Sequence, residues 1–228
     1  MLTLENVSYS YTGRSSRVDV LHGVTCTFEQ GKFYTIQGPS GCGKSTMLSL
    51  MAALDHPQEG RILYDGTPLK EIKTARYRHS CVTTIFQRFN LLTYATVIEN
   101  VMYPQLLNGV KAAEARKAAA ELLAKVDIAE SLHKRLPRNL SGGEQQRVAI
   151  ARALAAGAKV ILADEPTGNL DEENSRRVVA ILKQLVREKD GQPGSGKTII
   201  MVTHDGDLAK EADVMYSLRG GMLRVVEA

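Results

Sequence analysis

Residues Phe33–Leu54 read FYTIQGPSGCGKSTMLSLMAAL, a strand pattern followed by a glycine-rich loop and a helix pattern. Phe33–Gln37 predicts a strand, and the apolar spacing of Thr46–Leu54 predicts a helix. Between them, Gly38–Ser45 fits G-x-x-x-x-G-K-[ST]. Glycines in such a loop let successive N–H groups point at one anion, at the positive end of a helix. This order of elements predicts a phosphate-binding loop.

The chemistry of the loop assigns a role to each polar residue. Lys44 would reach the terminal phosphates, Ser45 would ligate Mg²⁺, and Thr46 would be a further phosphate donor. An ordinary glycine-rich turn is the alternative reading. The residues of this candidate nucleotide-binding loop are Gly38, Pro39, Ser40, Gly41, Cys42, Gly43, Lys44, Ser45 and Thr46.

The same pattern occurs a second time in the chain. Gly191–Thr198 reads GQPGSGKT, but it follows a helix pattern and leads into the strand pattern TIIMV. A phosphate loop must instead leave a strand and open a helix. The Gly, Pro and Ser content of the second copy is typical of a surface turn, so only the first copy is predicted to bind a nucleotide.

Composition bounds the class of protein. The chain has 228 residues, 43% of them hydrophobic and 24% charged, with a net charge of +4, as expected for one large globular domain. No apolar stretch reaches the roughly 18–20 residues that span a bilayer, and the start lacks the layout of a signal peptide. Three widely spaced cysteines argue against a disulfide framework and a zinc site. Any association with a membrane is therefore expected to be peripheral.

Strand and helix patterns alternate along the chain. Strands are expected at Met1–Tyr9, Val24–Phe28, Arg61–Tyr64, Cys81–Phe86, Val160–Ala163 and Thr198–Thr203, and a helix at Glu173–Lys189. This alternation predicts a parallel sheet with crossover helices. From Gln87 to about Ala156 we expect only helices, because stretches such as KAAEARKAAAELLAKV are rich in strong helix formers.

Two acids end a wholly apolar strand at VILADE, residues Val160–Glu165. In phosphate-loop enzymes the first acid, here Asp164, holds Mg²⁺, usually through water. Glu165 could orient or deprotonate the water that attacks the γ-phosphate. The alternative is that both acids merely end a strand in solvent, and the phosphate loop makes this reading weaker.

Leu140–Gln145 reads LSGGEQ and opens a helix pattern; we call it the signature segment. Ser141 and Glu144 form a capping box, which does not explain Gly142 and Gly143. Each glycine costs up to roughly 1 kcal/mol relative to alanine in a helix, which is reasonable if an anion must approach the first N–H groups closely. One ATP needs only one cradle, so the second cradle would serve a nucleotide held by another copy.

Together these segments resemble the nucleotide-binding subunits of ABC transporters over essentially the whole chain. The resemblance implies an α/β fold: a P-loop NTPase core with a mainly parallel sheet, a small antiparallel β subdomain and an inserted helical subdomain. Residues 1–228 would form a single ABC ATPase domain. The α/β core with the antiparallel β subdomain would comprise residues 1–86 and 157–228, and the helical subdomain carrying the signature segment residues 87–156.

The resemblance also implies roles for further residues. Gln87 matches the glutamine that senses Mg²⁺ or the attacking water, and His204 matches the histidine that contacts the γ-phosphate. Asp171 matches an aspartate that communicates across a dimer, a role compatible with the alternative of a helix N-cap. Tyr11 lies where the family has an aromatic ring stacked on adenine, although Tyr9 is two residues away and is expected on the same face. Catalysis is thus expected of Glu165, His204, Gln87 and Lys44.

For the whole molecule, the resemblance implies an ATPase whose cofactors are ATP and Mg²⁺. The residues of the metal site would be Ser45, Gln87 and Asp164. Two subunits would pack head to tail, each ATP lying between one phosphate loop and the other subunit's Ser141, Gly142, Gly143 and Glu144. Expected partners are a second ATPase subunit and a transmembrane permease, with no nucleic acid beyond the nucleotide. The location would be cytoplasmic, on the inner face of the membrane through the permease.

Permease contact is expected around Arg88–Leu107, with Phe89, Leu91, Leu92 and Tyr94 lining a docking groove; ordinary packing of these side chains is the alternative. ADEPTGNLD and the ENV segment at Glu99–Val101 most resemble the ATPases of lipoprotein release, macrolide export, antimicrobial-peptide export and cell division. Two other functions stay open: an ABC ATPase of DNA repair or translation, and a module that signals through a membrane partner. The sequence contains neither the long coiled-coil insertion of the repair proteins nor the second cassette of the translation factors. A transport assay of the complex in vesicles would distinguish a signalling module from a transporter.

Overall fold

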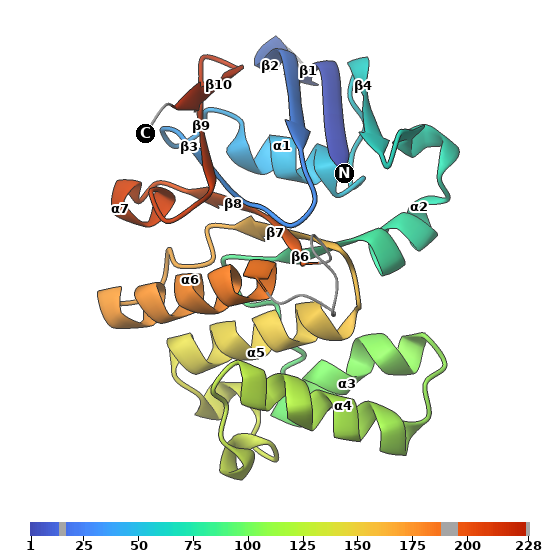
Figure 1. The fold of residues 1–228 in the computed structure, drawn as a ribbon, viewed down its shortest axis with the longest axis vertical. Coiled ribbons are helices and arrows are strands. Elements are labelled where there is room, and N and C mark those ends of the chain that lie inside the picture. The colour runs from blue at the N-terminus through green and yellow to red at the C-terminus, as the bar shows by residue number, and fades with distance from the viewer. Residues whose placement is uncertain (14–16, 188–195, 227–228) are drawn as a thin grey trace.

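The computed structural model describes residues 1–13, 17–187 and 196–226, and it contains two β-sheets packed with helices (Figure 1). The larger sheet has the strand order β10-β9-β3-β8-β7-β6. All its pairings are parallel except that of β10 with β9. Its strands are β3 (Phe33–Gln37), β6 (Val82–Ile85), β7 (Val160–Asp164), β8 (Thr198–Thr203), β9 (Val214–Arg219) and β10 (Met222–Val226).

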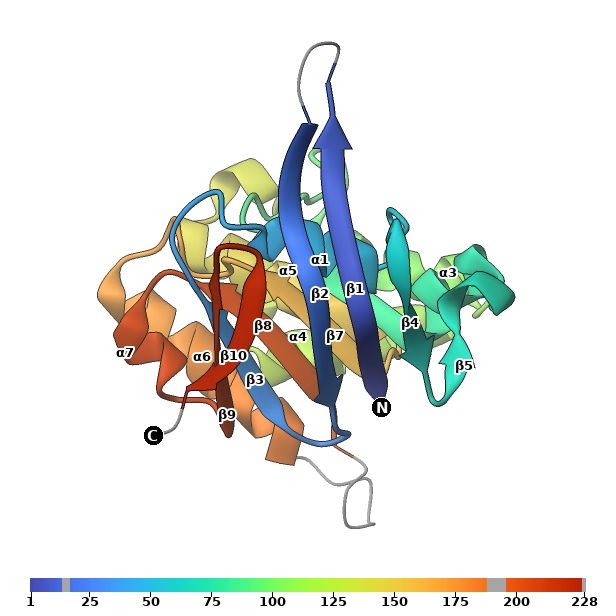
Figure 2. The same cartoon turned by 90° about the horizontal axis from the view of Figure 1, so that it is seen from above.

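The smaller sheet is antiparallel and has the order β2-β1-β4-β5. Figure 2 shows its two long strands, β1 and β2, passing over α1 (Lys44–Met51). Buried side chains of α1 therefore pack in one cluster with residues of both sheets. The strands are β1 (Leu2–Thr12), β2 (Arg17–Phe28), β4 (Glu59–Tyr64) and β5 (Thr67–Pro68).

Both faces of the larger sheet are buried. In β8, Ile200 and Val202 belong to the cluster around α1, whereas Ile199 and Met201 belong to the cluster that contains α5 and α6. A parallel sheet covered on both faces has strands that are apolar throughout. This is why β8 reads TIIMVT and could be located from the sequence.

The helices α3, α4 and α5 pack against one another below the larger sheet (Figure 1). α6 lies between α5 and the larger sheet in the same view, and it contacts α5 and β8. The helices are α2 (Thr74–Arg76), α3 (Val97–Leu107), α4 (Ala112–Lys125), α5 (Gly142–Ala155), α6 (Glu172–Arg187) and α7 (Gly206–Ala209). Shorter helical turns are η1 (Leu69–Glu71), η2 (Tyr77–Cys81), η3 (Glu130–Leu132) and η4 (Pro137–Asn139).

The mainly parallel sheet, the small antiparallel sheet and the helices confirm the predicted fold class. β3 and β8 have the predicted bounds. The expectation of helices throughout Gln87–Ala156 is wrong. Residues 86–96 form turns and irregular chain, and the stretch between α4 and α5 contains two short 3₁₀ helices joined by turns.

The irregular segment before α3 is held by one buried amide. Asn100 is fully buried in α3; its Oδ1 accepts from Leu92 N at 2.7 Å, and its Nδ2 donates to Leu92 O and Ala95 O, each at 3.1 Å. A side chain thus satisfies backbone groups that a helix would have paired internally. α3 itself starts at a capping box of Thr96 and Glu99, a helix-start signal visible in the sequence.

Replacing Asn100 by alanine is expected to lower the free energy of unfolding by about 1–3 kcal/mol, because buried backbone groups lose their partners. Urea unfolding followed by circular dichroism measures this. Asn108→Ala, at the exposed end of α3, is the control and should change the free energy by less than about 0.5 kcal/mol. Equal losses in the two variants would contradict the role given to Asn100.

Candidate nucleotide-binding and hydrolysis site

The phosphate loop joins β3 to α1, as the sequence predicts. Gly43 is the N-cap of α1 with φ 104°, and it makes no side-chain capping bond. The first N–H groups of α1 are therefore left for another acceptor, as an anion-binding helix start requires. A side chain at Gly43 would place its first carbon 2.7 Å from Val20 Cγ1, and one at Gly38 would place it 2.3 Å from Leu218 O. Glycine is thus required at both positions.

Lys44 is buried and folded back over its own loop. Its Nζ donates to Gly38 O at 2.8 Å and to Pro39 O at 3.0 Å. The ammonium group is therefore held across the loop by two backbone carbonyls, at the start of α1.

Asp164 joins the phosphate loop at the carboxyl edge of the sheet. Ser45 Oγ donates to Asp164 Oδ1 at 3.0 Å. Burial raises the pKa of the Asp164 carboxyl, and the hydrogen bond from Ser45 opposes this. One hydroxyl and one carboxylate suit Mg²⁺, which binds few protein oxygens and completes its shell with phosphate and water. No cluster of three or more His, Cys, Asp or Glu that could hold a metal is found among the described residues.

Glu165 sits next to Asp164 in a strained backbone position. Its φ is 44°, a left-handed conformation rare for residues other than glycine, and its N–H donates to Val202 O at 3.1 Å. Strain of this kind is concentrated at functional sites. The Glu165 Oε2 lies 3.4 Å from Nδ1 of His204, whose side chain is 59% exposed. The structure thus brings together the predicted base and the predicted histidine.

Gln87 reaches the same place from the end of β6. A side chain at Gly168 would put its first carbon 2.8 Å from Gln87 Nε2 and 3.4 Å from Glu165 Oε2. Gly168 therefore leaves room for both side chains, a role that sequence reasoning missed although Gly168 lies in ADEPTGNLD. The Asn169 amide fixes the backbone of Gln87 by donating to its carbonyl at 3.1 Å.

Tyr11, rather than Tyr9, is free to face a base. Tyr9 is buried, and its hydroxyl donates to Asp55 Oδ2, which raises the pKa of Tyr9 to about 12. Tyr11 is 51% exposed, and its hydroxyl lies 3.1 Å from Thr46 Oγ1 at the start of α1. The Tyr9 ring meets the Tyr11 ring edge to face at 5.1 Å and supports it from one side.

The signature segment forms the predicted capping box at the start of α5. Ser141 Oγ accepts from Glu144 N at 3.3 Å, and Glu144 Oε2 accepts from Ser141 N at 2.7 Å. α5 belongs to the lower helices in Figure 1, whereas α1 lies between the sheets above. One chain therefore carries two glycine-containing helix starts, those of α1 and α5, in different places.

The two glycines of the signature segment differ in the space around them. A side chain at Gly143 would place its first carbon 2.2 Å from Asn174 Oδ1, so packing within the chain explains this glycine. At Gly142 the nearest atoms would be 3.5 Å away or more, which is ordinary contact. The expectation that both glycines admit an anion from outside is therefore wrong for Gly143. Only at Gly142 does packing within the chain leave the choice of glycine unexplained.

The side chain of Asp171 caps the start of α6, which confirms the N-cap alternative. Its Oδ1 accepts from Asn174 N at 2.8 Å at the start of α6, and the hydrogen bonds from Asn174 lower its pKa. Asn174 also lies 3.4 Å from Arg147 Nη1. This asparagine, which sequence reasoning missed, links the segment around Asp171 to α5.

The second copy of the phosphate-loop pattern, Gly191–Thr198, is followed by a different kind of element from the first. Residues 191–195 lie outside the described residues, as does most of the stretch Arg187–Lys197 that is expected to be a surface insertion. Lys197 Nζ donates to Ala158 O at 2.8 Å, and Thr198 is the first residue of β8. A strand rather than a helix thus follows this copy.

Comparison with known proteins identifies the family of the chain. The ABC transporter family model matches residues 21–168, which include the phosphate loop, the signature segment and both strand-end acids. The chain belongs to the ABC transporter family. It is similar to an uncharacterised ABC transporter ATP-binding protein of Bacillus subtilis, with 40% identity covering 100% of this chain and 97% of that protein.

Two solved structures are similar to this ABC ATPase over the full length of both chains. They are a dimeric structure of the ABC transporter cassette MJ0796 (35% identity, TM-score 0.89) and a dimeric post-hydrolysis state of that cassette bound to ADP and Pi (34%, 0.88). A macrolide export ATP-binding/permease protein of Hyphomonas neptunium is 41% identical, but this chain covers only 34% of it. The chain is thus an ABC transporter ATP-binding subunit and an ATPase, as predicted. Within the described residues, no helix is long and apolar enough to cross a membrane.

Lys44→Ala is expected to weaken ATP binding by about 10- to 150-fold, because a charged hydrogen-bond donor to phosphate is worth about 1.5–3 kcal/mol. Titration with a fluorescent ATP analogue measures it. Lys197→Ala should bind ATP as the unaltered chain does. The reverse pattern would mean that the second loop, and not the first, holds the nucleotide.

Proposed function

We propose that two copies of this ATPase, or one copy and a related subunit, bind two Mg-ATP between them head to tail and drive a separate transmembrane permease. The observation that carries this proposal is the pair of helix starts, α1 and α5, in one chain. Each ATP would lie between Gly38–Thr46 of one subunit and Ser141, Gly142, Gly143 and Glu144 of the other. The dimeric state of the similar cassette MJ0796 supports this arrangement, and Asp171 would communicate across it.

Within each site, the chemistry follows from the residues at the sheet edge. Ser45, Asp164 and Gln87 would hold Mg²⁺, directly or through water, and Mg²⁺ would neutralise charge on the β- and γ-phosphates. Lys44 would bind the terminal phosphates. Glu165 would take the proton of the attacking water, and His204 would contact the γ-phosphate and restrain Glu165.

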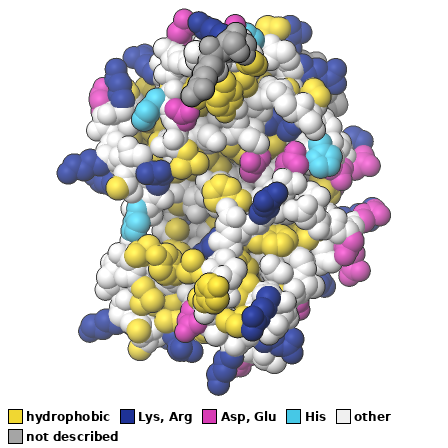
Figure 3. All heavy atoms as spheres, turned by 180° about the vertical axis from the view of Figure 1, so that it is seen from behind, with side chains coloured by type: hydrophobic (Ala, Val, Ile, Leu, Met, Phe, Trp, Pro, Cys, Tyr) yellow, Lys and Arg dark blue, Asp and Glu magenta, His cyan; other side chains and the backbone are white. Residues whose placement is uncertain are grey.

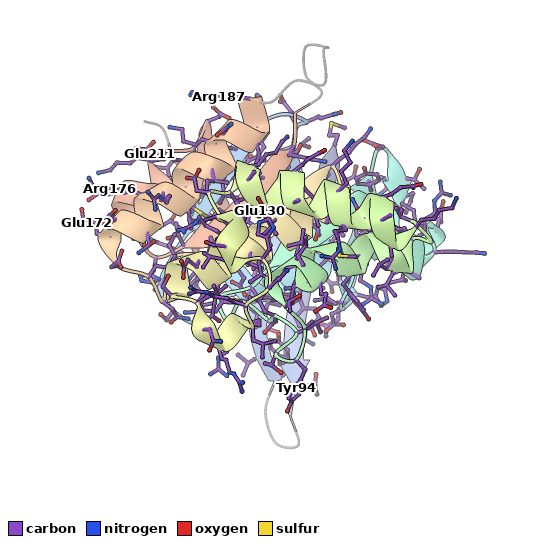
Figure 4. All side chains as sticks on the ribbon, turned by 90° about the horizontal axis from the view of Figure 1, so that it is seen from below. Tyr94, Glu130, Glu172, Arg176, Arg187 and Glu211 are labelled. Carbon is purple, nitrogen blue, oxygen red and sulfur yellow. The ribbon has the colours of Figure 1, made fainter. Side chains whose placement is uncertain are left out.

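The permease would dock on the side of the helical unit, residues 87–156, that carries exposed apolar groups. Leu92 is 41% and Tyr94 98% exposed, and Tyr103, Leu106 and Leu107 of α3 add to them. Figure 3 shows hydrophobic side chains gathered on the lower part of this face, and Figure 4 shows Tyr94 at the end of the molecule opposite Arg187. Of the other two predicted docking residues, Leu91 packs on the core and Phe89 is partly buried. The docking surface is thus Leu92 and Tyr94 with α3, at the inner, cytoplasmic side of the membrane.

Export is the direction that we propose, because macrolide export ATP-binding/permease proteins are among the similar sequences. The second candidate is an ATPase that regulates or signals through a membrane partner without moving a solute. Both functions need the same nucleotide chemistry, and the same exposed surface on α3 would serve either partner.

Glu165→Gln is expected to slow ATP hydrolysis by about 10²- to 10⁴-fold, the usual contribution of a general base, while ATP binding is kept. The variant should then accumulate as an ATP-bound dimer, measured by light scattering with and without ATP. Glu172→Gln, exposed at the start of α6, is the matched control and should hydrolyse ATP normally. Unchanged turnover in Glu165→Gln would remove Glu165 from the mechanism, and a slow variant that stays monomeric with ATP would refute the dimer.

Tyr11→Leu is expected to weaken ATP binding by about 5- to 150-fold, because stacking of a base on an aromatic ring is worth about 1–3 kcal/mol. Tyr11→Phe keeps the ring and loses only the hydroxyl beside Thr46, so its affinity should stay within about threefold of the unaltered chain, since such a bond contributes little net energy. Calorimetry with ATP measures both. Equal losses in the two variants would assign the effect to the hydroxyl and exclude stacking.

A further inference from the structure

The turn that follows Gln87 is strained. Phe89 has φ 29° and Asn90 has φ 50°, two successive non-glycine residues in the left-handed region, and Asn90 N bonds back to Arg88 O. Such backbone persists only where surrounding groups hold it. The position of Gln87, which immediately precedes this turn, depends on what holds it.

Arg152 of α5 holds the turn. Its Nη1 donates to Asn90 O at 2.6 Å and its Nη2 to Phe89 O at 2.9 Å. The planar guanidinium offers two donors in a fixed fork, so one side chain binds two successive carbonyls. Within the described part of the chain, Arg152 has no acidic partner, and burial lowers the pKa of its guanidinium. The side chain therefore serves the turn and not an ion pair.

The turn is connected to both the reacting groups and the signature segment. On one side, Gln87 Nε2 and Glu165 Oε2 both border Gly168, 2.8 Å and 3.4 Å from where a first side-chain carbon of Gly168 would stand. On the other, Phe89 Cζ lies 3.8 Å from where a first side-chain carbon of Gly142 would stand. Arg152 follows Ser141 by about three helical turns, or about 16 Å. α5 thus begins at the surface proposed for the partner's ATP, and Arg152, near its other end, binds the turn that follows Gln87 of the same chain.

We propose that Arg152 is a positioning residue for ATP hydrolysis: it fixes the Phe89–Asn90 turn so that Gln87 is held beside Glu165, and it ties Gln87 to the signature helix. Arg152 touches neither nucleotide nor metal in this role. The inference rests on the proposed participation of Gln87 in hydrolysis.

The test measures kcat and KM for Mg-ATP in the full chain and in Arg152→Lys, Gln87→Ala and the double variant. Lysine keeps the charge but has no planar fork. We expect Arg152→Lys to lower kcat about 10-fold or more, as misplacement of a group by about 1 Å does, with KM within about twofold. If Arg152 acts through Gln87, the double variant should be no slower than the slower single variant. Arg177→Lys, exposed on α6, is the control with normal kcat.

Each other outcome overturns a specific statement. A normal kcat in Arg152→Lys with a slow Gln87→Ala, or losses that multiply in the double variant, refutes the positioning role alone. A normal kcat in Gln87→Ala refutes the proposed role of Gln87 and this inference with it. A raised KM with unchanged kcat would make Arg152 a binding residue. If Arg152→Lys does not fold, Arg152→Gln is the second variant, because it leaves no buried charge. It is also expected to lower kcat about 10-fold or more with KM within about twofold.

Discussion

The hydrogen bond from Ser45 to Asp164 joins two segments on which the rest of the site depends. Ser45 lies in the first turn of α1, which follows β3 through the phosphate loop, and Asp164 ends β7. β8 lies between β3 and β7 in the sheet. Because the strands are parallel, their carboxyl ends meet at one edge, where the phosphate loop, both acids and His204 must converge. A helix start supplies donors for phosphate there, and Glu165, the residue after β7, has a positive φ and lies 3.4 Å from His204 Nδ1 through its Oε2. The order of the parallel strands thus brings the phosphate loop, both acids and His204 to one edge of the sheet, and Glu165 is strained there.

The position of α1 follows from a second constraint, burial on two sides. The helix is packed between the larger sheet and the β1–β2 strands, so it cannot shift away from the loop it caps. This packing is also why Gly43 must be glycine: Val20 of β2 approaches within 2.7 Å of the space a side chain would need. The same strand pair brings Tyr11 next to Thr46. The antiparallel sheet therefore fixes the phosphate loop and carries the ring proposed for adenine.

The sequence was informative wherever one local segment determines the outcome. Phe33–Gln37, the loop after it and the strand with Asp164 all have local patterns, and so does the capping box of Ser141 and Glu144. Sequence reasoning failed where the cause lies in a distant residue. Gly143 is explained by Asn174, and the non-helical backbone after Gln87 is held by Arg152 and Asn100. Long-range side-chain contacts of this kind have no periodicity, so helix propensity over Gln87–Ala156 gave the wrong answer at that turn.

α5 meets opposite requirements at its two ends. In the proposed dimer its start would face a ligand from outside; Gly142 is uncrowded there, while Gly143 is packed on Asn174. Its later turns are almost completely buried and must move as one body with the core, because Arg147 contacts Asn174 and Arg152 binds the turn after Gln87. A rigid helix with an open start and a buried end can respond to a ligand only as a unit. In the proposed dimer, a displacement of Ser141 by the partner's ATP would reach Gln87 and Asp171 together, through Arg147 and Arg152 on the same helix.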